Sequence, residues 1–578
     1  MYGSHPPRTA FVALLFVSAA CLARPSAAQD APAAKADGIP AGVAPEIRGV
    51  LTKSEIVLDR LQTAMKLTTD KEFEQYATLK DFIEVFLIGV DRQKPVRLDV
   101  LTGKNETSYR LHVPIAEGQF RDFWKENLVP LGIPVQGYAK QPGLYRLGGN
   151  AGAAFNGLML YDPKQRGGYA TIVEDAKELP PPNGPVPTAG VQDLLKSGHD
   201  AALSLRNQAK GIEERHAHFA AQREDVLGKL KRDTDESASD FNLRKFAAGV
   251  QFDETERLYA EAKDVFIGLQ VTPESAQAKG ALRLEPLPGT SLADSVALIS
   301  QNASRFAGVP RGEGGATTGR INFPLDPMRK EHFLALSAKI RENEIEEVGL
   351  SQESNPAQKE AGKQFLTGFF DLIDEGLTAG LIDGFIEMAK GHGELYTIVG
   401  GLKSPDGTKW IPVLSLVPQL RNGPTFKENV GEHAGVTFHE MVVTKEQHPD
   451  FIELFGDGRL LVGTAKDAVW YAAGPQAEET LKQAIDQSAG AGEPEATFLS
   501  FRGELLPGLR ILDRRLGTTG FDKFRKMAID AFENGDGRAS IEMTKNGDAI
   551  DGSIVLEPGI LRLVGKALAD FSQQNLAE

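Results

Sequence analysis

Short matches between the two halves of the chain constrain its fold more than any other feature of the sequence. The matched segments, first half then second half, are Phe82–Glu84 and Phe385–Glu387, Val113-Pro114 and Val417-Pro418, Lys125–Asn127 and Lys427–Asn429, Gly157 and Gly458, and Tyr169 and Tyr471. They occur in the same order, separated by 301 to 304 residues. A nearly constant separation is typical of an internal repeat. The sequence therefore predicts two tandem related units, at residues 46–310 and 320–578.

A second pair of segments has a shorter separation. Residues 266–286 end in Leu-Glu-Pro, and so do residues 539–558, 272 residues later. Each segment has the pattern of a strand, a turn and a second strand, with Pro before a helix. The shorter separation predicts about thirty additional residues in the first unit. We assign them to a helical insertion at 188–263.

The apolar patterns of the two units predict the same elements in the same order. The expected elements are helices at 70–89 and 358–390, hairpins of 96–101 with 108–113 and of 395–400 with 410–416, and helices at 117–130 and 423–431. Further strands follow in each unit. We therefore expect the α+β class, with two tandem units that each combine a mostly antiparallel sheet with packed helices.

Residues 1–28 have the three regions of a secretory signal peptide. Arg8 precedes an apolar run at 10–22, and Ser26-Ala27-Ala28 offers small residues for cleavage. Residues 29–45 are rich in Ala, Pro and Gly, which is typical of a flexible leader. The sequence thus predicts export, to the periplasm or to the outside of the cell.

Cys21 is the only cysteine of the chain. Two alanines precede it, so the alternative to cleavage after Ala28 is a lipoprotein anchored through Cys21. Cleavage after Ala28 would remove Cys21, which excludes disulfides, thiol catalysis and cysteine-bound metals from the mature chain.

Charge and hydropathy argue against a nucleic-acid partner and against a transmembrane segment. The chain has 64 Lys and Arg against 79 Asp and Glu, a net charge of −15. Nucleic-acid binding depends on basic surfaces that neutralise phosphates, so we expect no nucleic-acid partner. No apolar run after the signal reaches the ~20 residues that span a bilayer. We expect no transmembrane segment in the mature chain.

Two motifs of well-known sites are incomplete. Residues 314–320 approach a phosphate-binding loop, but Arg320 stands where that loop has Lys. His439-Glu440 begins like a zinc-protease helix, but Val443 occupies the position of the second His. Neither segment predicts a cofactor or metal site.

Two other patterns also fail as metal sites. His216 and His218 lie two positions apart on an expected helix, so their side chains diverge. The turns at 455–459 and 534–538 lack the acidic ligands that complete a calcium loop, and we expect them to lead into strands. We therefore predict no catalytic, metal-binding or cofactor-binding residue and no cofactor, and the binding residues stay open.

The signal peptide and the strand–Pro–helix repeats at 266–286 and 539–558 resemble those of uncharacterised exported bacterial proteins with duplicated α+β units. The resemblance implies no activity. Our leading expectation is a non-enzymatic exported protein that binds an envelope component, a lipid-like molecule or a protein, at a sheet face or in a cleft between its halves. The alternatives are a carboxylate-dependent hydrolase with its site between the halves, for which glycans are a candidate substrate, and a carrier with an apolar cavity.

Overall fold

The computed structural model describes residues 43–576, apart from 103–106, 131, 150–154, 165–166, 181–190, 235, 310–315, 392–394, 490–491 and 510–521. The expected signal peptide, Cys21 and nearly all of the expected leader lie outside the described residues. Of the segment 314–320, residues 314 and 315 also lie outside them, and residues 317–320 belong to a strand.

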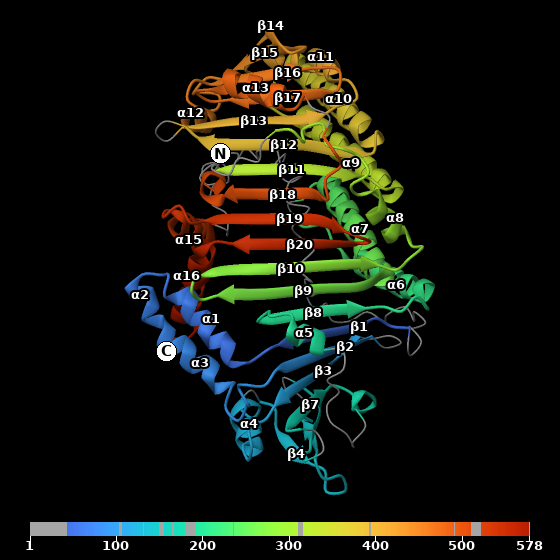
Figure 1. Cartoon of the computed structure of the whole chain (residues 1–578), viewed down its shortest axis with the longest axis vertical. Coiled ribbons are helices and arrows are strands. Elements are labelled where there is room, and N and C mark those ends of the chain that lie inside the picture. Colours follow the sequence, from blue (N-terminus) through green and yellow to red (C-terminus); the bar gives the residue numbers. More distant parts are fainter. Residues whose placement is uncertain are drawn as a thin grey trace.

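Within the described residues, twenty strands pair into one antiparallel sheet (Figure 1). The first ten are β1 (Glu46–Leu51), β2 (Val96–Thr102), β3 (Thr107–Pro114), β4 (Val135–Gly137), β5 (Leu144–Leu147), β6 (Gly157–Tyr161), β7 (Tyr169–Val173), β8 (Ala201–Arg206), β9 (Ala262–Thr272) and β10 (Gln277–Pro286). The second ten are β11 (Thr317–Pro324), β12 (Leu381–Lys390), β13 (Tyr396–Lys403), β14 (Thr425–His433), β15 (Val436–Val442), β16 (Arg459–Thr464), β17 (Ala468–Ala473), β18 (Thr497–Glu504), β19 (Arg538–Asn546) and β20 (Ala549–Leu556).

The two sets of ten strands follow one order. From the outer edge to the centre, the first set runs β4-β5-β6-β7-β3-β2-β1-β8-β9-β10. The second set runs β14-β15-β16-β17-β13-β12-β11-β18-β19-β20, the same order with each number raised by ten. β10 and β20 pair at the centre, where Ala281 lies opposite Ser553. The chain is α+β, and its large sheet is antiparallel.

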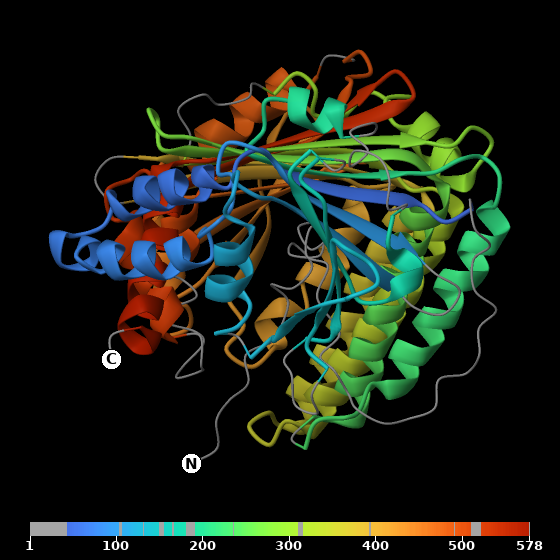
Figure 2. The ribbon, with the colours of Figure 1, turned by 90° about the horizontal axis from the view of Figure 1, so that it is seen from below.

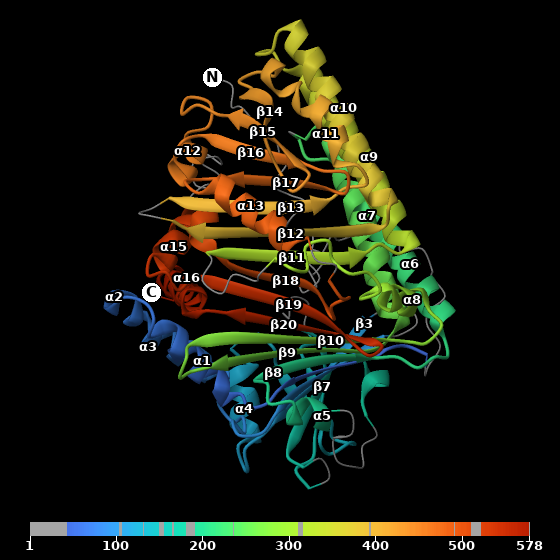
Figure 3. The same cartoon turned by 45° about the horizontal axis from the view of Figure 1, so that its top comes forward.

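Most of the longer helices form two groups below the two sides of the sheet (Figure 2 and Figure 3). The helices of the described residues are α1 (Glu55–Met65), α2 (Asp70–Phe73), α3 (Gln75–Val85), α4 (Phe120–Asn127), α5 (Gln192–Lys196), α6 (Ile212–Lys229), α7 (Ala238–Glu261), α8 (Ser291–Leu298), α9 (Pro327–Leu350), α10 (Pro356–Thr378), α11 (Trp410–Leu414), α12 (Pro449–Phe455), α13 (Ala477–Gln487), α15 (Asp522–Phe532) and α16 (Pro558–Asn575). In one group α16 packs against α1, α3 and α15, and in the other α9 packs against α7 and α10. Each group therefore combines helices from both halves of the chain.

The long helices begin at clear capping signals. The side chains of Ser237, Asp326 and Asn355 accept hydrogen bonds from backbone N–H groups in the first turns of α7, α9 and α10. Pro327 and Pro356 occupy the first helical positions of α9 and α10, where a missing N–H has no cost. The cap at Asp326 fixes where α9 leaves β11, whereas the caps at Ser237 and Asn355 begin the second helices of the pairs α6–α7 and α9–α10.

Three predicted elements of the second half were wrong. The helix expected at 358–390 ends at Thr378, Gly380 turns the chain with φ +77°, and β12 follows. Periodicity cannot separate a short buried apolar strand from a helix. The helix expected at 423–431 is the exposed strand β14, whose charged side chains suit a sheet edge. The strand expected at 410–416 is mostly α11, and β13 pairs instead with β12 and β17.

The matched segments of the two halves also need correction. Phe82 lies on α3 and Phe385 on β12, so this match joins a helix to a strand. Lys125 is helical and Lys427 lies on β14. The proposed helical insertion at 188–263 contains the strand β8 as well as helices. By contrast, 266–286 and 539–558 each contain the predicted strand, turn and strand.

Candidate functional site

The two faces of the central strands differ in chemistry. On β9, Phe266 packs with Ala202 of β8 against Leu194 of α5, and we call this side the outer face. Ile267 and Leu269 of β9 point to the opposite side, because neighbouring residues of a strand alternate. We call this second side the inner face, and both helix groups lie on it (Figure 2).

The outer face of the central strands is polar. Lys279 and Arg283 of β10 are exposed there, and Arg283 forms a salt bridge of 2.8 Å with Asp551 of β20. Glu542 of β19 and Arg502 of β18 are also exposed on this face. A sheet with one solvated face normally presents polar residues on it, so this is the ordinary solvent side.

The inner face carries an apolar stripe that crosses ten strands. The register places these residues in line, from β2 to β10: Leu98, Gly49, Leu203, Ile267 and Leu282. From β12 to β20 a second row contains Ile386, Gly319, Phe501, Ile541 and Ile554. Because Ile554 lies opposite Gly280 and not opposite Leu282, the two rows meet at the centre with an offset of two residues. None of the ten has a polar or charged side chain. Continuous apolar surface of this kind marks a binding surface when it is exposed.

The centre of this stripe is open. Leu269 is 49% exposed, and Ile267 and Ile554 are 37% and 38% exposed. Farther along the strands, Val265 and Leu284 are covered, because they pack with Leu258 of α7. The helix groups thus cover the strand ends and leave the middle of the apolar face in contact with solvent.

Glycines flatten the inner face. Gly280 of β10 lies opposite Ile554 and opposite Leu269, and a Cβ placed there would be 3.5 Å from the Ile554 side chain. At Gly400 of β13 the ring of Tyr471 lies over the backbone, 2.3 Å from the position of a Cβ. The side chains of Ile554 and Tyr471 occupy the space beside these glycines, so the surface of the inner face has no gap there.

A buried polar cluster occupies the outer face of the first half. His112 Nε2 lies 3.2 Å from Asp99 Oδ2, and His112 Nδ1 lies 2.9 Å from Thr171 Oγ1. These residue types resemble those of a catalytic triad, but Thr171 and His112 are 0% and 1% exposed. Burial lowers the pKa of His112, against the opposing effect of Asp99. A substrate has no access to this hydroxyl.

Two of the three corresponding positions of the second half are aromatic, and the third is glycine. Arg97, His112 and Thr171 lie in line on β2, β3 and β7, as Phe385, Gly401 and Trp470 do on β12, β13 and β17. Phe385 and Trp470 pack with Phe306 and with α13. At these positions of the outer face, the second half has a hydrophobic core where the first half has a buried polar cluster.

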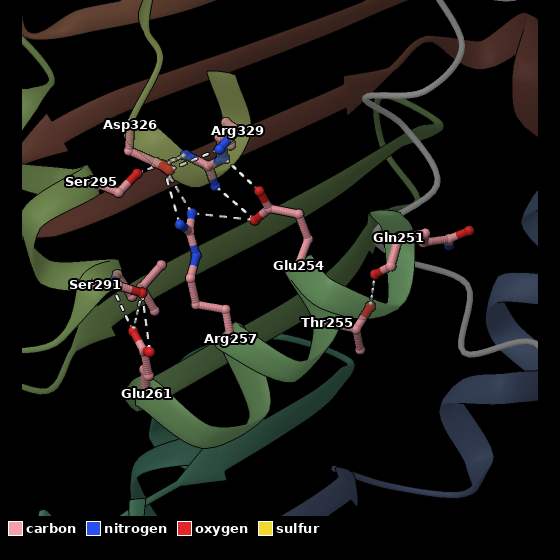
Figure 4. A network of polar contacts seen from close by, with 10 residues as sticks. Gln251, Glu254, Thr255, Arg257, Glu261, Ser291, Ser295, Asp326 and Arg329 are labelled. Atoms are coloured by element: carbon pink, nitrogen blue, oxygen red, sulfur yellow. Dashed lines mark hydrogen bonds and ion pairs between the residues drawn. The ribbon is translucent and has the colours of Figure 1, made fainter. Parts of the chain in front are cut away.

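An ionic network joins the two halves beside the inner face (Figure 4). Arg257 of α7 lies 3.2 Å from Asp326, the N-cap of α9, and the two side chains are 3% and 4% exposed. Glu254 bridges to Arg329 at 2.7 Å. Burial opposes ionisation of Asp326, but the Arg329 N–H and the guanidinium of Arg257 outweigh it and lower its pKa. Paired charges of this kind hold helices together.

The histidines considered from the sequence lie in separate places. His216 Nδ1 lies 2.8 Å from Glu256 and its Nε2 lies 3.2 Å from Glu261, whereas His218 is buried beside Gln222. His439 lies on β15 and contacts Thr464 at 3.0 Å. Among the described residues no group of His, Cys, Asp and Glu side chains is arranged to hold a metal ion.

The two turns considered as calcium loops lead directly into strands, as expected. β16 begins at Arg459 and β19 begins at Arg538. Asp383 and Glu344 are the described carboxyls with a raised pKa, and they lie apart in the chain, on β12 and α9. Burial raises the pKa of Asp383, whose oxygens accept hydrogen bonds from Ser304 Oγ and the Arg305 N–H.

Sequence reasoning did not find the inner face. The signal was present as alternation. On β9, Gly268 separates Ile267 from Leu269, and on β10, Arg283 separates Leu282 from Leu284. Alternation predicts one apolar face. It does not tell whether that face is covered, which depends on where distant helices pack.

Comparisons with known protein families, with curated proteins and with solved structures give no match. In the part of the chain that the structure describes, no helix is both long and apolar enough to cross a membrane.

Proposed function

We propose that the chain binds an apolar, lipid-like ligand on the inner face of its sheet. One observation carries the proposal: Ile267, Leu269 and Ile554 are exposed around Gly280 at the centre of a face whose aligned side chains are apolar. Exposed apolar area costs free energy in water, about 25 cal/mol per Å². Covering it with hydrocarbon recovers that free energy.

A hydrocarbon fits this face better than a polar ligand does. The stripe offers no hydrogen-bond donor or acceptor from its side chains, because its members are aliphatic, aromatic or glycine. Ligand sites for polar molecules contain a few placed polar groups. A carboxylate hydrolase has less support, since buried Asp383 already has hydrogen bonds to both oxygens.

The proposal includes an origin by duplication and an exported location. The common strand order and the symmetric register of β10 and β20 support duplication. The pattern of residues 1–28 supports export. The binding residues would then belong to both units and meet where β10 pairs with β20.

Binding can be tested with the apolar fluorescent probe N-phenyl-1-naphthylamine. We expect the unaltered chain to enhance its fluorescence, and Leu269→Asn to weaken binding about tenfold. The matched control is Leu350→Asn, which makes the same change at the exposed end of α9, where Leu350 is 71% exposed. Equal binding by the two variants would contradict the assignment of the site to the inner face.

A further inference from the structure

We infer that the ligand is a single long hydrocarbon chain that lies across the strands and contacts both halves of the molecule. This inference rests on the proposed function and adds the shape and size of the ligand. It depends on the dimensions of the apolar stripe and on where the stripe is open.

The stripe is long and narrow. It crosses ten strands between Leu98 of β2 and Ile386 of β12. Nine strand spacings of about 4.8 Å give a length of about 43 Å. The acyl chains of two opposed leaflets together fill only about 30 Å. The stripe is therefore longer than two ordinary acyl chains placed end to end.

The open region is narrow, and its width suits a hydrocarbon chain. On β9 the open residues are Ile267 and Leu269, which are separated by about 7 Å along the strand. Val265, on one side of them, is already packed against α7. A folded protein partner needs a broad interface of about 800 Å² per partner, and this strip is too narrow to provide it. Hydrocarbon needs no hydrogen bonds, and the stripe offers none from its side chains.

The most exposed part of the stripe lies where the two halves meet. Ile267 belongs to the first half and Ile554 to the second, and Gly280 lies between Leu269 and Ile554. Toward the two ends, Leu98 and Ile386 are only half-buried and so can still contact a ligand. If each half held its own short ligand, the open surface would lie within each half. Its position across the junction favours one ligand that crosses it.

The neutral isoprenoid alcohols geraniol, geranylgeraniol and solanesol test the length of the ligand, because they differ in chain length within one chemical class. We expect displacement of N-phenyl-1-naphthylamine to tighten along this series, with solanesol at least about tenfold tighter than geranylgeraniol. Native mass spectrometry should find one solanesol per chain.

Variants at the ends of the stripe separate long from short ligands. Leu98→Asn and Ile386→Asn should each weaken solanesol binding about fivefold and leave geraniol unchanged, whereas Leu269→Asn should weaken all three. Leu350→Asn is the control. Thermal unfolding verifies that each variant folds, and the chain-length series on the unaltered chain does not depend on them.

The outcomes distinguish this inference from the proposed function. Affinity that stops rising at geranylgeraniol, with two molecules bound per chain, would overturn the single long ligand and leave apolar binding intact. Failure of all three alcohols and of the fluorescent probe to bind would overturn both.

Discussion

Ala281 and Ser553 lie directly opposite each other where the two halves of the sheet meet. They are 272 residues apart, the same separation that relates the Leu-Glu-Pro sequences at 284–286 and 556–558. Adding 272 to the residue numbers 278–284 gives 550–556, and these two segments pair with each other in the sheet. The register at the centre therefore has two-fold symmetry, and the two parts of the apolar stripe meet across it.

A methyl group at the centre of the inner face should stabilise the fold. The φ of Gly280 is not positive, and a Cβ there would make only ordinary contacts of 3.5 Å or more. Glycine in a strand costs about 0.5–1 kcal/mol relative to Ala. We expect Gly280→Ala to raise the free energy of unfolding by about that amount in urea denaturation.

Gly400 is the contrasting position. A Cβ there would lie 2.3 Å from the Tyr471 ring, which must then move. We expect Gly400→Ala to lower the free energy of unfolding by about 1–3 kcal/mol, as overpacked cores do. If Gly400→Ala proved neutral and Gly280→Ala destabilising, the packing described for the inner face would be wrong.

Removing Arg257 should be costly. Its partner Asp326 is nearly inaccessible, and Arg329 would remain 3.4 Å from that carboxylate as a partial substitute. Breaking a buried pair costs about 3–5 kcal/mol, so we expect Arg257→Ala to lose about 3 kcal/mol. The control is Arg283→Ala at the exposed pair with Asp551, for which we expect less than about 1 kcal/mol. Chemical denaturation of both variants measures the difference.

The His216 imidazole predicts a stability that falls as pH rises. The hydrogen bond to Glu261, together with Glu256, raises its pKa above 6.5 in the folded chain. The stabilisation from its protonated form is fully present below pH 6.5 and is lost as pH rises through the higher folded pKa. The difference in unfolding free energy between the unaltered chain and His216→Gln should therefore shrink between pH 6 and 8. A constant difference across this range would contradict the ion pairs.

His112 should give the opposite slope. Burial lowers its pKa below 6.5 despite the nearby Asp99 carboxylate, so the folded chain keeps the imidazole neutral. As pH falls below 6.5, the unfolded chain gains a proton first, and the folded state loses stability until the lower folded pKa is reached. We expect the unaltered chain to lose stability relative to His112→Gln over this range. Histidine NMR titration gives an independent measure of both pKa values.

The sequence predicted local pairings better than the packing of distant elements. The hairpin of 96–101 with 108–113 was predicted because Gly103 and Asn105 are turn residues between two apolar strands, and it is present as β2 and β3. The helix expected at 358–390 failed because a buried strand continues its apolar run after Gly380. Local periodicity contains no information that distinguishes these cases.

The inner face could be predicted only in part. The alternation around Ile267 and Leu269 indicates one apolar face, but Gly319 and Phe501 join that face through pairings between strands distant in the sequence. The exposure of Ile554 depends on α7 and α16 covering the strand ends and leaving the middle open. These are tertiary facts, and no local propensity determines them.

The two halves of the chain should not fold independently. β10 of the first half pairs with β20 of the second, and Lys566 of α16 contacts Glu72 of the first half at 3.0 Å. A polypeptide of residues 43–309 would expose the β10 edge and the faces of α1 and α7 that pack against the second half. Unpaired strand edges and exposed apolar surface lead to aggregation.

We therefore expect residues 43–309 and 316–576 to be insoluble when each is expressed alone and to co-purify as a one-to-one complex when expressed together. Size-exclusion chromatography measures the stoichiometry of the complex, and far-UV circular dichroism measures whether each half is folded. A folded, monomeric first half would show that the shared helix groups and the β10–β20 pairing are dispensable.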